Sequence, residues 1–92
     1  MKPIYVTFFD GEPLGYFEKI DTAHRYIIER ARLLENDLKR RYGKSAIDIK
    51  SVEDHLANSV TITYRVLGIV YDGPLITNTY SYAELHVLSD PL

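Results

Sequence analysis

The sequence predicts an α+β fold in which an antiparallel sheet is covered on one face by a single long helix. Apolar residues recur at three- and four-residue spacing through residues 21–42, which is the period of an amphipathic helix. Runs rich in β-branched and aromatic residues stand before and after that segment, and Asp-Gly turns interrupt them. The predicted order is therefore ββαβββ, and we expect one domain over residues 1–92.

The first hairpin is predicted from residues 4–9 and 14–18, which flank the turn Asp10-Gly11-Glu12-Pro13. Pairing Phe9 with Leu14 places Ile4, Val6 and Phe8 on one face with Phe17. We expect this face to lie under the helix.

The helix is predicted to begin with Asp21 as its N-cap and to end before Gly43, the residue type most common just past a helix C-terminus. At about 1.5 Å per residue it would be roughly 33 Å long, enough to cross the whole sheet.

Residues 46–52 follow as the third predicted strand, and residues 53–58 read as a polar loop, with one helical turn capped at Ser51 as an alternative. The last hairpin is predicted from residues 60–71 and 76–88. Because Pro74 has no N–H to donate, we expect a four-residue loop that sets Tyr71 opposite Ile76, rather than a two-residue Asp-Gly turn.

This register gives the uncovered face of the sheet an unusual share of aromatic and aliphatic side chains, including five of the eight tyrosines. Solvated sheet faces are normally polar, so we expect a partner to cover this one. Self-association is the expected cover, and the alternatives are residues 53–58 or 90–92 of the same chain, another protein, or a ligand. The expected interface or ligand residues are Arg65, Leu67, Ile69, Tyr71, Ile76, Tyr80, Tyr82, Glu84 and His86.

Two chemistries are conceivable within this face. Arg65 beside Tyr80 and Tyr82 would suit a planar or anionic small molecule, which stacks on a ring and accepts hydrogen bonds from a guanidinium. Glu84 and His86 point the same way along one strand and could form an acid/base couple, although cross-strand polar pairing explains the same residues.

A basic run at the end of the helix is a second candidate, for anions: Lys39, Arg40, Arg41 and Lys44. Cations there also complement the helix dipole. The four-residue pairs Arg25–Glu29, Glu35–Lys39 and Asp37–Arg41 along the helix would neutralise much of its positive charge. The three histidines stand 31 residues apart without ligand spacing, so we expect no metal and no cofactor.

Composition sets the remaining limits. The 92 residues are 46% hydrophobic and 26% charged, which excludes a disordered tail, and the net charge of −2 argues against specific nucleic-acid or membrane binding. The absence of cysteine excludes disulfides and thiolate chemistry, and no apolar run approaches the roughly 18 residues that span a bilayer. We therefore expect a cytoplasmic, non-enzymatic binding or assembly module that forms a homodimer. A small-molecule or nucleotide binder, an inhibitor of a larger protein, and a hydrolytic enzyme are the alternatives.

Overall fold

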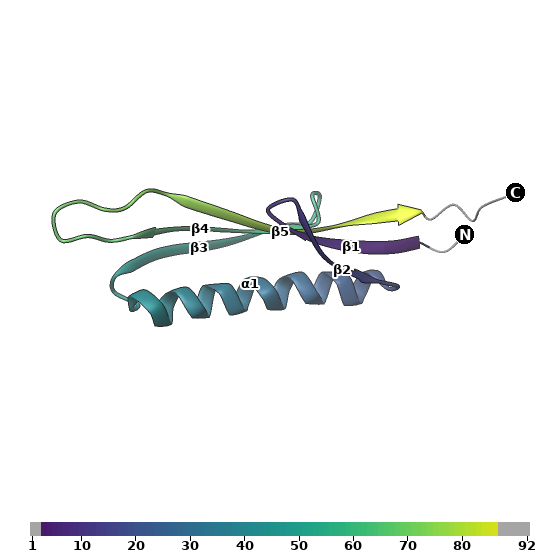
Figure 1. Ribbon diagram of the computed structural model, residues 1–92, viewed down its shortest axis with the longest axis horizontal. Coiled ribbons are helices and arrows are strands. Elements are labelled where there is room, and N and C mark those ends of the chain that lie inside the picture. The colour runs from purple at the N-terminus through teal and green to yellow at the C-terminus, as the bar shows by residue number, and fades with distance from the viewer. Residues whose placement is uncertain (1–2, 87–92) are drawn as a thin grey trace, which may run out of the picture.

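The predicted order of elements is confirmed by the computed structural model, which describes residues 3–86 (Figure 1). Its elements are β1 (Pro3–Phe9), β2 (Glu12–Phe17), α1 (Ile20–Tyr42), β3 (Ile47–Asp54), β4 (Ser59–Val66) and β5 (Ile76–His86). The five strands form one antiparallel sheet in the order β2-β1-β5-β4-β3, and α1 packs along one face. The fold is therefore α+β.

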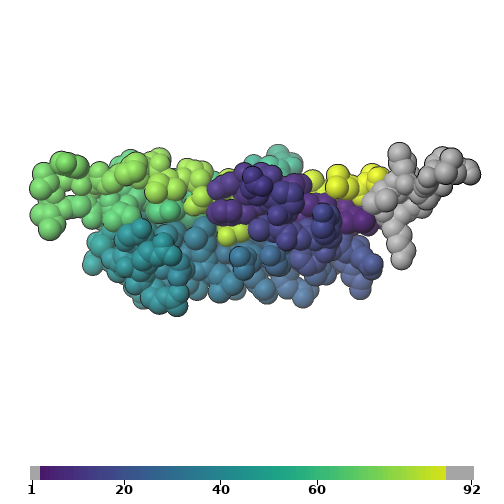
Figure 2. Space-filling view, viewed as in Figure 1, coloured from purple at the N-terminus to yellow at the C-terminus, as the bar shows by residue number. Residues whose placement is uncertain are grey.

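The sheet is long because its central strand, β5, is paired along different halves on its two sides. β1 pairs with the second half, from Pro3 opposite His86 to Phe9 opposite Tyr80, whereas β4 pairs with the first half. The hairpins β1–β2 and β3–β4 are thus displaced from one another along β5, and the molecule measures 65 × 21 × 19 Å (Figure 2).

The helix begins one residue earlier than predicted, at Ile20. Lys19 occupies the N-cap position without a side-chain cap bond, so the prediction of Asp21 as N-cap is wrong, and Asp21 lies in the first turn instead. At the other end Gly43 has a positive φ of 88°, and its N–H donates to the Lys39 carbonyl at 2.9 Å. The predicted C-terminal signal is confirmed.

The core lies between α1 and the middle of the sheet. Ile27 and Ala31 from the helix meet Val60, Ile62 and Tyr80 from the sheet, and all five are buried. Phe9 packs against Tyr80 at a ring-centroid distance of 4.7 Å, a normal separation for a packed aromatic pair. Within residues 3–86 no helix is long and apolar enough to cross a bilayer.

The predicted register of the first hairpin is wrong. Phe9 lies opposite Glu12 rather than Leu14, and the register shifts between Thr7 and Phe8. Farther along, Tyr5 lies opposite Phe17, which packs against Tyr26 of the helix. The helix therefore covers Tyr5, Thr7 and Phe9, and the side chains predicted to lie beneath it, those of Ile4, Val6 and Phe8, lie on the other face.

The register of the last hairpin is also wrong, for a related reason. The strand predicted to reach Tyr71 stops at Val66, and Ile76 lies opposite Tyr64. The partner of Ile76 is thus seven positions from the expected one, and an odd shift moves every side chain of β5 to the opposite face. Val87 and residues 88–92 lie outside the described residues. Residues 51–54 belong to β3, so no helical turn forms there.

Candidate interaction surface

The connection between β4 and β5 projects beyond the end of α1 (Figure 1). We call residues 67–76, from the end of β4 to the first residue of β5, the apolar arm. Its base is held by two backbone hydrogen bonds, from Leu67 N to the Ala46 carbonyl at 2.9 Å and from Gly73 N to the Val66 carbonyl at 2.8 Å. The arm is therefore attached to the α1–β3 connection as well as to β4.

A tight bend inside the arm depends on Gly68. A Cβ atom at this position would lie 2.1 Å from the Tyr71 carbonyl oxygen, closer than any side chain allows. The Gly68 N–H donates to an Asp72 carboxylate oxygen at 3.4 Å, and Asp72 is the only charged residue of the segment. The arm is thus a folded loop of its own, in which the single charge makes a local hydrogen bond.

The side chains that the arm exposes are almost all apolar. Ile69 is fully exposed, and Val70 and Tyr71 are more than four-fifths exposed. The remaining exposed apolar residues of the arm are Leu67, Leu75 and Ile76. A fully exposed side chain offers about 60–120 Å² of apolar surface, so the six, at their individual exposures, offer roughly 250–500 Å². That is close to the largest apolar patch of a typical monomer, about 300–600 Å², gathered at one tip of the molecule (Figure 2).

The sheet face opposite α1, here called the open face, is mainly polar at its centre rather than aromatic. β4 and β5 place hydroxyl side chains there in neighbouring pairs, and the hydroxyls of Thr61 and Thr79 lie 3.2 Å apart. The other members of these pairs are Thr63 with Thr77 and Ser59 with Ser81. Hydroxyl groups are easily hydrated, so this region alone does not demand a cover.

A second apolar surface lies on the open face at the β1–β2 end, far from the arm along the sheet. We call it the apolar end patch, and its residues are Ile4, Val6, Phe8, Tyr16, Ala83 and Leu85. Val6 is buried at its centre between its cross-strand neighbours Tyr16 and Ala83. Tyr16 is 73% exposed and Leu85 about half exposed, so the patch presents an aromatic ring and aliphatic carbon to solvent.

Neither edge of the sheet is suited to adding another strand. The edge strand β3 carries four charged side chains, those of Asp48, Lys50, Glu53 and Asp54, and the opposite edge strand, β2, contains Pro13. Charges and proline are the usual features that keep exposed edges from pairing. The arm and the end patch are therefore the surfaces best suited to contact a partner.

The expected ligand cluster of Arg65, Tyr80 and Tyr82 is not assembled. Tyr80 is only 6% exposed and belongs to the core, where burial raises the pKa of its hydroxyl above 10. Tyr82 packs against the same core, whereas Arg65 lies opposite Asp48 on the open face. The cause is the odd register shift of β5, which turned both tyrosines toward the helix.

Glu84 and His86 do lie together, as their spacing predicts. Their side chains approach to 3.7 Å, and the Tyr5 hydroxyl donates to the other Glu84 oxygen at 3.4 Å. Desolvation, followed by the Glu84 charge, raises the pKa of Tyr5 above its usual 10. Both members of the Glu84–His86 pair are about half exposed, so these residues form a surface network rather than an enclosed acid/base site.

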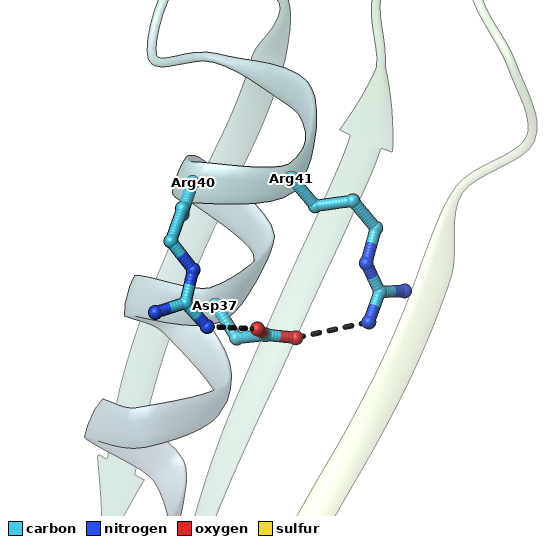
Figure 3. A network of polar contacts seen from close by, with 3 residues as sticks. All are labelled: Asp37, Arg40 and Arg41. Carbon is cyan, nitrogen blue, oxygen red and sulfur yellow. Dashed lines mark hydrogen bonds and ion pairs between the residues drawn. The ribbon is translucent and has the colours of Figure 1, made fainter.

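The basic run at the end of α1 is largely paired with carboxylates. Asp37 holds Arg40 at 2.6 Å and Arg41 at 3.0 Å, and Lys39 lies 3.0 Å from Glu35 (Figure 3). The predicted pairs Glu35–Lys39 and Asp37–Arg41 are confirmed, whereas the predicted pair Arg25–Glu29 does not form among the described residues. These exposed pairs contribute little to stability, about 0–1 kcal/mol each, and their carboxylates offset part of the positive charge that would attract an anion.

One group of titratable side chains escaped the sequence reasoning. His24 from α1 and His55 from the β3–β4 turn lie with their rings nearly parallel at 6.4 Å, and Tyr82 meets His24 edge-on. They line a hollow of about 60 Å³ with Glu53, far below the roughly 300–1,000 Å³ of small-molecule sites. In the described part of the chain, no three histidines or carboxylates are arranged to bind a metal.

A second hollow, of about 150 Å³, lies between α1 and β3 and is also small for a ligand site.

Compared with known proteins, the chain matches no family model, no curated protein and no solved structure.

Proposed function

We propose that this protein is a non-enzymatic binding or assembly module that contacts another protein through the apolar arm. The observation that carries the proposal is the full exposure of Ile69 within a segment that has six exposed apolar side chains. Burying such a surface on a partner is favourable at about 25 cal/mol per Å², and the arm needs no matching charge because its single carboxylate is engaged locally.

Four of the expected interface residues belong to the proposed contact surface. Leu67, Ile69, Tyr71 and Ile76 lie in the arm, and Val70 and Leu75 join them. Val70 was missed because residues 67–71 resemble a strand, and Leu75 because it was assigned to the loop that follows. Gly68 near the middle of that run, and Gly73 and Pro74 after it, were the available signals of a loop.

The two alternatives gain less support. A hydrolytic enzyme built on Glu84 and His86 needs an enclosed site, and neither residue lines either of the two hollows. A small-molecule binder built on Arg65, Tyr80 and Tyr82 needs the rings exposed, and Tyr80 is in the core. The proposed setting is the cytoplasm, where disulfides are rare and a chain without cysteine is at no disadvantage in stability.

Site-specific photo-cross-linking in the host cell tests this proposal. A benzophenone side chain replaces Ile69 in one variant and Leu56, an equally exposed residue of the β3–β4 turn, in a control. We expect discrete adducts from position 69 and none from position 56. An arm that yields no adduct, or adducts no different from those of the control, contradicts the proposal.

A further inference from the structure

We infer that the partner of the apolar arm is a second copy of this chain, in a two-fold dimer in which the arm of each protomer lies on the apolar end patch of the other. The inference rests on the proposed function and adds the identity and arrangement of the partner. It starts from the position of the two apolar surfaces, at opposite ends of a molecule 65 Å long.

The two surfaces cannot cover each other within one chain. The arm extends the sheet past the end of α1, and the end patch lies on β1, β2 and the last residues of β5 (Figure 1). A two-fold axis lying between two open faces, across their long direction, brings each arm over the opposite patch. This single rotation covers the arm and the end patch of both protomers, because every contact of an isologous interface occurs twice.

The area agrees with what a stable dimer needs. Ile76 lies opposite Tyr64 on the α1 side and is left out of this interface. The other five exposed side chains of the arm, with Tyr16 and Leu85 of the end patch, offer roughly 300–600 Å² of apolar surface per protomer. A standard interface buries about 800 Å² on each partner, of which somewhat more than half, or roughly 450–500 Å², is apolar. The arm and the end patch together reach this apolar area, whereas either surface alone falls short of it.

The surface between the two apolar regions also fits this arrangement. The central rows of the open face are threonine and serine pairs, which are uncharged and which can hydrogen-bond across an interface or retain water. The charged residues of the face, Asp48, Lys50, Arg65 and Asp54, lie on β3 or on its neighbour β4. They would form a polar rim at one side, which is the usual anatomy of an interface.

Because the chain has no cysteine, engineered disulfides report on this geometry directly. The double variant Ile69→Cys with Leu85→Cys should form a dithiothreitol-reversible covalent dimer under mild oxidation. Neither single variant should form a covalent dimer. The double variant Leu33→Cys with Leu85→Cys should form none either, since Leu33 is an exposed residue of α1. Circular dichroism of each variant establishes that it is folded, and sedimentation of the wild-type chain should give twice 10.6 kDa at micromolar concentration.

Four results would overturn the inference. Ile69→Cys alone cross-linking as well as the double variant would indicate arm-to-arm contact. A mass that grows beyond the dimer would indicate an open head-to-tail chain, and a dimer that no variant cross-links would place the contact elsewhere. A wild-type monomer up to about 100 μM would exclude a second copy. If the photo-adducts from position 69 then contain a different protein, the proposed function stands and only the identity of the partner is wrong.

Discussion

Asp10 and Thr79 are joined by two reciprocal hydrogen bonds. The Asp10 N–H donates to the Thr79 carbonyl and the Thr79 N–H donates to the Asp10 carboxylate, both at 2.8 Å. Asn78 adds a third bond from its side-chain amide to the second carboxylate oxygen at 2.8 Å. The contact lies where the pairing of β5 passes from β4 to β1, so the β1–β2 turn helps to hold the register that turns Tyr80 toward the helix.

Replacement of Asp10 by alanine should therefore weaken the sheet at its centre. We expect Asp10→Ala to lower the free energy of unfolding by about 1–3 kcal/mol, because two donors lose a charged acceptor and alanine tolerates the positive φ of 49° poorly. Asp10→Asn should cost less, since asparagine accepts that φ and retains one acceptor oxygen. Urea denaturation of both variants checks the difference, and equal losses would contradict this role.

The core between α1 and the sheet predicts a second result. Ile62 is fully buried beneath the helix, so Ile62→Ala should lower the free energy of unfolding by about 2–5 kcal/mol through cavity formation. Val52→Ala on the exposed part of β3 is the control and should cost much less. Chemical denaturation measures both. A loss below about 1 kcal/mol for Ile62→Ala would mean that this face is not the core.

Tyr80 should make the fold sensitive to alkali. The pKa of Tyr80 is raised above 10 in the folded protein, and burial is the largest cause of the rise. The unfolded chain therefore ionises first as the pH rises. Stability from this group is fully present below about pH 10 and is lost above it. The free energy of unfolding should fall less between pH 9 and pH 11 in Tyr80→Phe than in the wild type. Identical pH profiles for the two proteins would contradict the burial of this hydroxyl.

The fold class was predictable from the sequence because helix periodicity and the strand-rich flanks agree over many residues. The faces of β1 and β5 were not, because they depend on register, and register depends on single residues at turns. Phe17 of β2 does face the helix as predicted, where it packs against Tyr26. The shift at Thr7 and Phe8 moved the side chains of β1 to the opposite face, and the early end of β4 at Val66 did the same for those of β5. Strand propensity could not reveal that Leu67 to Tyr71 fold into a loop, since Ile69, Val70 and Tyr71 favour strands.

The shape of the arm should depend on Gly68. In Gly68→Ala the new Cβ would overlap the Tyr71 carbonyl, so the bend must open. Because the arm lies outside the core, we expect the free energy of unfolding of the monomer to change by less than about 1 kcal/mol, while dimerisation weakens at least about tenfold. Gly15→Ala is the control, since a Cβ there meets only ordinary contacts at 3.8 Å. Unchanged dimerisation in Gly68→Ala would show that the arm takes no part.

The role of the arm in self-association is tested most directly by a pair of leucines with equal exposure. Leu75 in the arm is 60% exposed and Leu33 on α1 is 59% exposed, so aspartate at either site changes charge and hydrophobicity alike. Sedimentation equilibrium of the wild type, Leu75→Asp and Leu33→Asp at one micromolar concentration compares their masses. We predict 10.6 kDa for Leu75→Asp and twice that value for the other two. Equal masses for all three proteins, or dissociation of Leu33→Asp alone, would contradict the account.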